Sequence, residues 1–291
     1  MIPALVNQSE LYFECGGPAY RLSHRVAHKL RIGHSFTTRI LGFLAITWFP
    51  ILFFSVIEGR ALGPEPRDSF LLDFGTYSRF FLGVPLLIVA ESVVGPRLRA
   101  AGLQFVDGGF VPPEAYPDFN RAILLTAKLR ESVWAELVIL AVAVTGAWLF
   151  TAETIAGEVI ATWRSPSPSG TGFGMSLTAL WYRLIAIPIL QFFWYRWLWR
   201  LLCWAIFLWT VSRLNLSLVG THADQAGGLG FLGTAHSSLG IFAFALSGVL
   251  SAEAAFLMFF QGTDIDAFKV PFVALLVVVE LIVLGPLLTF V

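Results

Sequence analysis

The sequence predicts an all-α, polytopic transmembrane helix bundle of about six spans, with an N-terminal interfacial amphipathic helix and long helices that project into the cytoplasm. Of its 291 residues, 57% are apolar and 13% are charged, whereas a soluble domain usually carries about 25% charged residues. The apolar residues gather in long blocks, which is typical of bilayer spans. Many Trp and Tyr residues stand at the ends of these blocks, where aromatic rings favour the headgroup layer. We therefore expect the lipid bilayer to be a direct partner.

Six apolar blocks are long enough to cross a bilayer at 1.5 Å per residue. They predict spans near 40–57, 77–94, 133–151, 177–195, 239–260 and 270–291. The chain then divides into a cytoplasmic N-terminal segment, residues 1–38, and a helix bundle, residues 39–291. The first 35 residues lack the apolar core of a cleavable signal peptide, so we expect the first span to target the chain to the membrane.

The distribution of basic residues predicts that the N-terminus faces the cytoplasm. With that orientation, 13 of the 19 Lys and Arg residues fall on the cytoplasmic side: Arg21, Arg25, Lys29, Arg31, Arg39, Arg97, Arg99, Arg121, Lys128, Arg130, Arg196, Arg200 and Arg213. The opposite loops carry only Arg60, Arg67, Arg164 and Lys269. This asymmetry follows the positive-inside rule.

The sequence defines the structure of three segments less clearly. Residues 177–215 are almost continuously apolar but contain Arg196 and Arg200, so they form either one long or bent helix, about 58 Å if straight, or two spans. In residues 20–33, cations recur every fourth position, which indicates an amphipathic helix lying on the membrane surface. Residues 118–131 are expected to form a helix that runs straight into the third span.

An unpaired charge inside a membrane span costs several kcal/mol, and three of the ionisable residues in the predicted spans lie at comparable depth. Helix geometry places Arg183, Glu253 and Glu280 roughly 9, 11 and 15 Å below the outer surface. One hypothesis is an ion or proton pathway in which two carboxylates share one guanidinium. The alternative is a structural ion pair that fixes helix register. Glu91 and Glu136 lie nearer the cytoplasmic side. They either line an inner vestibule or form salt bridges at the membrane interface.

The segment 214–233 is the most distinctive stretch of the sequence. Gly228, Gly230 and Gly233 match GxGxxG, but a dinucleotide site also needs a βαβ unit, and this chain offers membrane helices instead. His222 and Asp224, with His236, provide a weak metal pattern. The simpler interpretation is a tight cytoplasmic loop in which glycine lets backbones approach. We predict no metal and no cofactor.

The run from His222 to Leu232, His-x-Asp-x-Ala-Gly-Gly-Leu-Gly-Phe-Leu, resembles a group of uncharacterised bacterial multi-span membrane proteins. The resemblance extends loosely from the second block to the end. It implies a location in the bacterial inner membrane and a basic cytoplasmic segment after Val291. It supplies no activity and no site residues.

Function is predicted at the level of class. A net charge of zero argues against nucleic acid as a partner, and the chain shows no hydrolase, metalloprotease or paired metal-carboxylate motif, so we do not expect an enzyme. We expect a membrane transport protein, an ion or proton channel formed by a homo-oligomer. The alternative is a non-transporting scaffold or sensor that binds a partner, such as an unlike membrane subunit, through its cytoplasmic loops.

Overall fold

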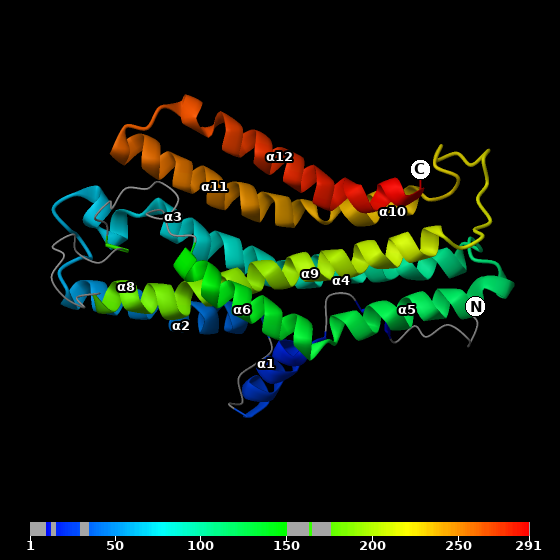
Figure 1. The fold of residues 1–291 in the computed structure, drawn as a ribbon, viewed down its shortest axis with the longest axis horizontal. Helices are drawn as coiled ribbons and strands as arrows, with labels where there is room; N and C mark the ends of the chain where they lie inside the picture. The colour runs from blue at the N-terminus through cyan, green and yellow to red at the C-terminus, as the bar shows by residue number, and fades with distance from the viewer. Residues whose placement is uncertain (1–9, 13–15, 30–34, 150–162, 165–175, 291) are drawn as a thin grey trace.

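The structure is a computed structural model that describes residues 10–12, 16–29, 35–149, 163–164 and 176–290 (Figure 1). The described residues are mostly helical and contain no β-strand. Among them, five helices are long and apolar enough to cross a membrane, or six if the bent pair 113–130 and 133–149 counts as one span. The predicted all-α membrane bundle is confirmed.

The helices run along one long axis (Figure 1). In chain order, the α-helices are α1 (Pro18–Lys29), α2 (Phe36–Ile57), α3 (Phe74–Tyr77), α4 (Val84–Asp107), α5 (Tyr116–Arg130), α6 (Val133–Leu149), α8 (Leu177–Trp181), α9 (Ile187–Ser212), α10 (Gly230–Ser237), α11 (Gly240–Gln261) and α12 (Lys269–Leu284). Two π-helical segments are η4 (Ser78–Gly83) and η6 (Tyr182–Ala186), and 3-10 turns are η2 (Pro66–Asp68), η3 (Phe70–Leu72), η5 (Pro113–Ala115), η7 (Ile265–Phe268) and η8 (Gly285–Phe290). We call the two ends of the bundle the α8 end and the α5 end.

The segment 177–212 is one continuous helix, because α8, η6 and α9 follow one another without a break. Likewise α3, η4 and α4 continue from residue 74 to 107, well past the predicted span 77–94. Both helices therefore extend beyond the membrane-spanning length towards the α5 end, as the long helices of the sequence prediction required. There they pack with α5 and α10.

The predicted straight passage from α5 into α6 is wrong. The two helices meet at 43° across a short break. Ser132 ends the first helical pattern and starts the second, since its hydroxyl accepts the Ala135 N–H at 3.3 Å. A serine in this position is a favoured N-cap and so favours a new helix over a continued one.

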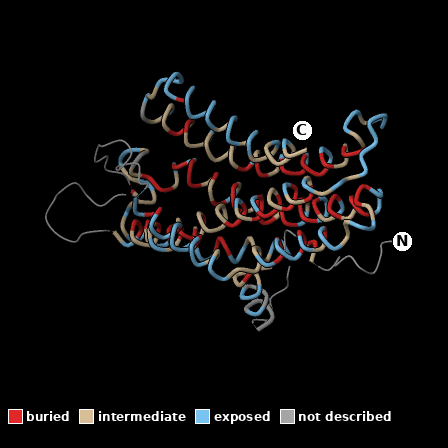
Figure 2. The backbone as a smooth tube through the Cα atoms, turned by 45° about the vertical axis from the view of Figure 1, so that its right-hand side comes forward, coloured by how far each residue is buried: buried red, intermediate tan, exposed pale blue. Residues whose placement is uncertain are grey.

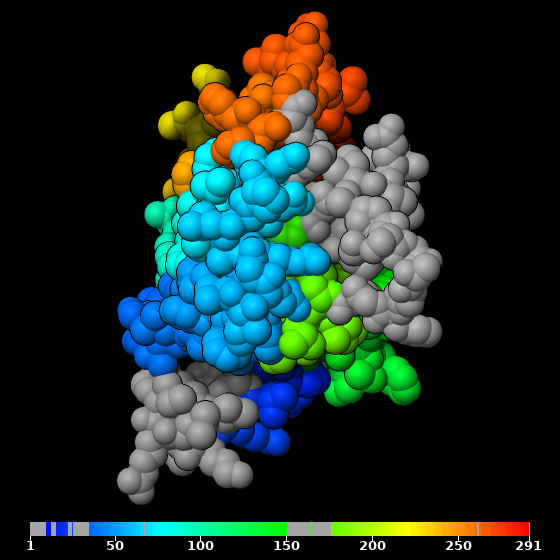
Figure 3. Space-filling model, turned by 90° about the vertical axis from the view of Figure 1, so that its left-hand side faces the viewer, coloured from blue at the N-terminus to red at the C-terminus, as the bar shows by residue number. Residues whose placement is uncertain are grey.

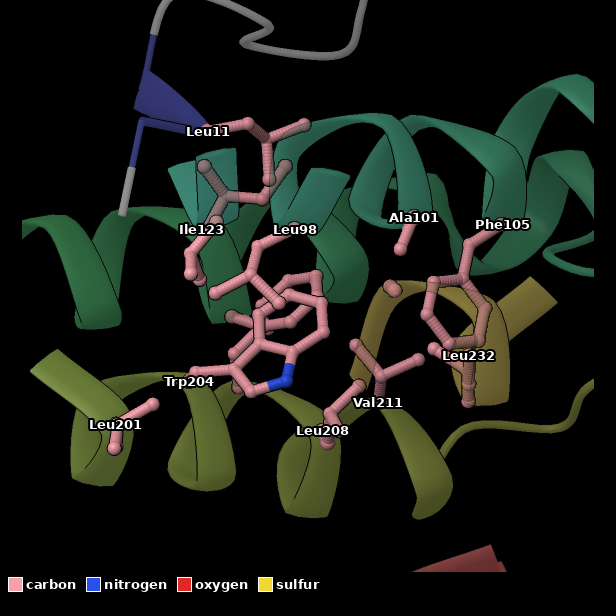
Figure 4. Packing of buried hydrophobic residues seen from close by; sticks show 14 of the residues in the cluster. Leu11, Leu98, Ala101, Phe105, Ile123, Leu201, Trp204, Leu208, Val211 and Leu232 are labelled. Atoms are coloured by element: carbon pink, nitrogen blue, oxygen red, sulfur yellow. The ribbon is translucent and has the colours of Figure 1, made fainter. Parts of the chain in front are cut away.

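Two hydrophobic cores lie along the bundle axis. The core at the α5 end is built around Trp204, with Phe105 on α4, Ile123 on α5 and Leu232 on α10 (Figure 4). The core at the α8 end includes Phe80 and Tyr182. Figure 2 shows buried residues concentrated where the central helices face one another, with exposed residues on the outer helices.

The α11–α12 hairpin is attached to this body unevenly. Gly262 closes α11 in a left-handed conformation, φ 66°, which glycine adopts without strain. Helix α11 packs on α3, η4 and α4, whereas α12 has no buried residue and packs extensively only with η7 and η8 at its ends. Seen from the α8 end, the hairpin forms the top of the molecule (Figure 3).

Candidate functional site

Four charged side chains meet near the α8 end, and we name Asp73, Arg79, Arg164 and Glu253 the Glu253 cluster. Arg79 Nη2 donates to Glu253 Oε2 at 2.6 Å, and Arg164 Nη1 donates to Glu253 Oε1 at 3.3 Å. Arg164 Nε also donates to Asp73 Oδ2 at 2.8 Å. Two carboxylates thus face two guanidinium groups, so the cluster is neutral and each charge has a partner, which partly buried charges require.

Asp73 is the most buried member of the cluster, with 1% of its side chain exposed. It is the N-cap of α3, accepting the Thr76 N–H at 3.0 Å, and it also accepts the Trp163 Nε1–H at 3.0 Å. Burial raises the pKa of Asp73, but the charges of Arg164 and Arg79 outweigh it and hold that pKa below its usual range. The carboxylate therefore stays ionised and ties α3 to residues 163–164.

The Glu253 cluster contacts both π-helical segments. Arg79 belongs to η4 and Tyr182 to η6, and Arg79 Nη1 donates to the Tyr182 hydroxyl at 3.1 Å. In each segment, the N–H of the residue that follows it donates to the carbonyl five residues earlier, as a π-helix requires. The next helix then has a proline at its second position: Pro85 in α4 and Pro188 in α9. Proline has no N–H to continue the i to i−4 ladder, so the wider turn occurs beside it.

The structure brings Glu253 together with Arg79 and Arg164. Of the other two members of the predicted trio, Arg183 lies half-buried on η6, next to Tyr182. Glu280 lies exposed on α12. The neighbouring Leu281 lines one groove with Leu198 of α9, which places Glu280 nearer the α5 end than Glu253.

A second charge cluster crosses the middle of the bundle. Glu91 pairs with Arg39 at 2.6 Å and with Arg200 at 2.8 Å. Arg196 lies 3.6 Å from Glu136. We name these five residues the Glu91 cluster. Glu91 and Glu136 thus form salt bridges in the structure, the second of the two interpretations drawn from the sequence.

The N-terminal segment docks on this cluster through its backbone. Glu131 Oε1 accepts the Gly17 N–H at 3.1 Å, and Glu136 Oε2 accepts the Ala19 N–H at 2.6 Å. Arg196 Nη2 donates to the Gly16 carbonyl at 3.0 Å. Both glycines have positive φ, and a Cβ atom on Gly17 would lie 2.4 Å from Glu136. We name Gly16 and Gly17 the glycine latch.

The glycine-rich loop binds its own carboxylate. Asp224 accepts N–H groups from Ala226 at 3.0 Å, Gly228 at 3.0 Å and Gly230 at 2.7 Å. Partial desolvation raises the pKa of Asp224, but these donors, Gly230 first, hold it well below the usual range. A Cβ atom on Gly228 would lie 2.4 Å from the Phe110 ring. The glycines therefore serve a compact turn, because Asp224 already occupies the N–H groups that a phosphate would need.

His222 and His236 each have a structural partner. His222 Nδ1 lies 2.8 Å from Asp224 Oδ1, and Trp204 Nε1 donates to His236 Nε2 at 3.2 Å. The part of the chain that the structure describes holds no group of three or more His, Cys, Asp or Glu side chains arranged to bind a metal.

An apolar groove of about 540 Å³ opens between α9 and the α12–η8 segment, towards the α5 end. Its lining residues are Leu198, Leu201, Leu202, Ala205, Ile206, Trp209, Leu281, Ile282, Gly285, Pro286 and Thr289. Arg213 stands at its far end, with the guanidinium 4.7 Å from the centre of the Trp209 ring. The groove begins two residues beyond Arg196 of the Glu91 cluster.

Sequence reasoning named Glu253, Glu91 and Glu136 as candidate site residues. It left the other six members of the two clusters out of the candidate sites: Asp73, Arg79, Arg164, Arg39, Arg196 and Arg200. Arg39 comes just before the first predicted span and Glu91 lies near the end of the second. Both therefore fall at the open end of the same helical hairpin, so the topology alone could have predicted that they pair. The contacts of Asp73 with residues 163–164 depend on tertiary folding and have no local signal.

The fold and its charges define a class: an α-helical, multi-pass membrane protein with ionic clusters at two levels of its bundle. No family model, no curated protein and no solved structure matches this chain.

Proposed function

We propose that this protein forms a homo-oligomeric pathway for cations or protons, with α12 lining the central axis. The observation that carries the proposal is the exposure of α12: the helix has no buried residue, yet it holds a carboxylate, Glu280, on its exposed surface. A carboxylate facing lipid is costly, and such residues usually face a bundle interior or a wet cavity. A second copy supplies that surrounding without any change in the protomer.

One face of α12 combines Glu280 with residues at the spacing of a helix-packing seam. Most residues of α12 are exposed, and those that share a face with Glu280 recur at intervals of three and four: Val270, Val273, Val277, Glu280 and Leu284. This 3–4 spacing is the pattern by which helices pack at small crossing angles, in water and in membranes. Symmetric packing of α12 helices therefore brings several Glu280 side chains together around one axis.

A ring of carboxylates favours cations. Acidic rings select cations in channels, and apolar constrictions beside them gate by excluding water. Here Val273 and Val277 would form the constriction and Glu280 the ring. Glu253, by contrast, is neutralised by Arg79 and Arg164, so we assign it a structural part. The charge that remains for the pathway is Glu280.

Disulfide cross-linking tests the assembly. With Cys15 and Cys203 replaced by alanine, Val277→Cys should cross-link between copies in the membrane, because the residue lies on the seam. Val278→Cys is the matched control, since Val277 and Val278 are 48% and 47% exposed but point about 100° apart around the helix. Equal cross-linking of the two variants, or none at Val277, contradicts the α12 axis.

Flux measurements test the pathway. Proteoliposomes should pass a monovalent cation or protons, and Glu280→Gln should remove most of this flux. Asp266→Asn, which removes an exposed carboxylate beside Lys269, should leave it unchanged. If wild-type protein cross-links through α12 but passes no ion at any pH, the oligomer exists and the transport proposal is wrong.

The apolar groove favours a second candidate function, a scaffold or sensor. If the N-terminus is cytoplasmic, the groove lies at the cytoplasmic end of the bundle, between the far part of α9 and the last turns of the final candidate span. Exposed apolar surfaces of this kind mark protein or membrane interaction sites. A partner, such as an unlike membrane subunit, that co-purifies with wild type and is lost on Leu202→Glu would support this function, whereas unchanged co-purification would exclude the groove.

We also propose a bacterial inner-membrane location with the N-terminus in the cytoplasm, supported by the asymmetry of basic residues. Ala226→Cys lies in an exposed part of the glycine-rich loop. In intact cells it should resist an impermeant thiol reagent and react after the cells are opened. Labelling in intact cells would invert the topology.

A further inference from the structure

We propose that α1 is a docking surface for anionic phospholipid headgroups in the leaflet on the N-terminal side of the bundle. This inference is independent of the proposed pathway, since it concerns the N-terminal segment and requires no oligomer. It combines the position of α1, the contacts that hold it there, and the side chains that it leaves exposed.

The position of α1 is set by the starts of two spans. Its first residues bond to Glu131 and Glu136, on either side of the point where α6 begins. A few residues after α1 ends at Lys29, α2 begins at Phe36. Figures 1 and 2 show α1 leaving the side of the bundle near the middle of its length. A helix held between the starts of two spans lies at the membrane surface.

The glycine latch fixes this position with backbone groups. Glu131 and Glu136 accept N–H groups of the first turn of α1 and the residue before it, which also places negative charge at the positive end of the helix dipole. Arg196 holds the preceding carbonyl. These bonds are made by the peptide backbone, and the side chains of Arg21, Leu22 and Arg25 remain exposed.

The exposed side chains of α1 fit an anionic membrane surface. Leu22 is 62% exposed, and Arg21 and Arg25 are exposed one helical turn apart. Arg21 also lies 3.4 Å from Glu131, a contact too exposed to use up its donors. Guanidinium groups bind phosphate oxygens through paired hydrogen bonds, and an apolar residue beside them can enter the headgroup boundary. This chemistry matches phospholipid phosphate.

Hydrogen exchange in vesicles of defined composition tests the proposal. The full-length protein is reconstituted in phosphatidylcholine alone and in phosphatidylcholine with phosphatidylglycerol. We expect the α1 amides to exchange several-fold more slowly with phosphatidylglycerol present, and this difference to shrink at high salt because ionic contacts are screened. The double variant Arg21→Gln, Arg25→Gln should lose most of the difference.

Arg121→Gln is the matched control, because it removes an exposed arginine from α5 and should keep the wild-type response. Equal exchange in both vesicles, or a double variant that responds like wild type, overturns the proposal. If inorganic phosphate added to phosphatidylcholine vesicles protects α1 as well as phosphatidylglycerol does, the surface binds free anions and the lipid assignment is wrong.

Discussion

The Glu253 cluster and the Glu91 cluster both pair carboxylates with arginines, but they join different kinds of structure. The Glu253 cluster connects side chains from η4, α11 and residues 73 and 164, two of each sign. The Glu91 cluster connects α2, α4 and α9, and through Glu136 and Arg196 it also binds peptide groups of the N-terminal segment.

The two clusters differ in their balance of charge and in their unpaired hydrogen-bond donors. The Glu253 cluster has equal numbers of acids and bases. The Glu91 cluster sets three arginines against two carboxylates, and Arg200 Nη2 has no hydrogen-bond partner among the described residues. The Glu253 cluster fixes helix positions, whereas Glu136 and Arg196 of the Glu91 cluster also hold the backbone of the N-terminal segment. The following substitutions separate these two roles.

The largest effect is expected for Glu91→Gln. The change keeps the shape of the side chain but leaves Arg39 and Arg200 without a counter-charge in a buried place, where breaking such a pair costs about 3–5 kcal/mol. Unfolding in mixed detergent micelles measures the loss. Asp118→Asn, in an exposed pair with Arg121, is the control and should change stability by about 0.5 kcal/mol or less. Similar losses for both would mean that Glu91 is solvated.

A smaller effect is expected for Asp73→Asn, which keeps the N-cap oxygen and removes the charge that Arg164 binds, a loss of about 1.5–3 kcal/mol. Because the folded-state pKa of Asp73 is lowered, its contribution is present above the unfolded value of about 3.9 and is lost as the pH falls through the folded value. Wild-type stability should fall in acid below that pH. The variant should show less of this fall, and an unchanged pH profile would contradict the assignment.

The glycine latch gives the next effect. Gly17→Ala forces an alanine into φ 87° and against Glu136, so it should cost about 1 kcal/mol or more and release α1 amides to exchange. Gly59→Ala is the matched control, because Gly59 has φ 69° but open space around its Cβ position. Equal losses would show that only backbone strain matters and that the contact with Glu136 does not.

The smallest effect is expected for Asp224→Asn, which belongs to neither cluster. The amide offers one acceptor oxygen where the carboxylate offers two, so the Gly228 and Gly230 N–H groups should exchange faster. Global stability should stay near wild type because the loop is largely exposed. A marked fall in global stability would instead make this loop part of the core at the α5 end.

Composition and block lengths were enough to predict the fold, since the physics of burying backbone in lipid leaves few choices. They also predicted the helix through residues 177–212 as one of two options. The bend at Ser132 was missed, although a serine N-cap is a local signal. At the candidate sites, depth along each helix identified Glu253 as a buried charge, but depth carries no information on which way a side chain points around the helix.

The ion-pair partner of each buried charge therefore could not be predicted from its depth along the helix. Arg79, the partner of Glu253, lies in the π-helical segment η4. An extra residue in a helical turn rotates the residues before it by about 100° relative to those after it. Pro85 marks this place in the sequence, and Pro188 marks the equivalent place before α9. These two prolines, with Arg79 and Arg183 before them, are the local sequence signal for the two π-helical turns.

The π-helical segment η6 joins α8 to α9 within one continuous helix. Below it, α9 runs as 26 unbroken residues, a rod of about 39 Å. Turning such a rod by about 10° at one end moves the other end by about 7 Å, by the same rise of 1.5 Å per residue. The far end of α9 forms one wall of the apolar groove and lies against η8. Any rotation of α9 at η6 would therefore move this wall of the groove, and Tyr182 of η6 is bonded to Arg79 of the Glu253 cluster.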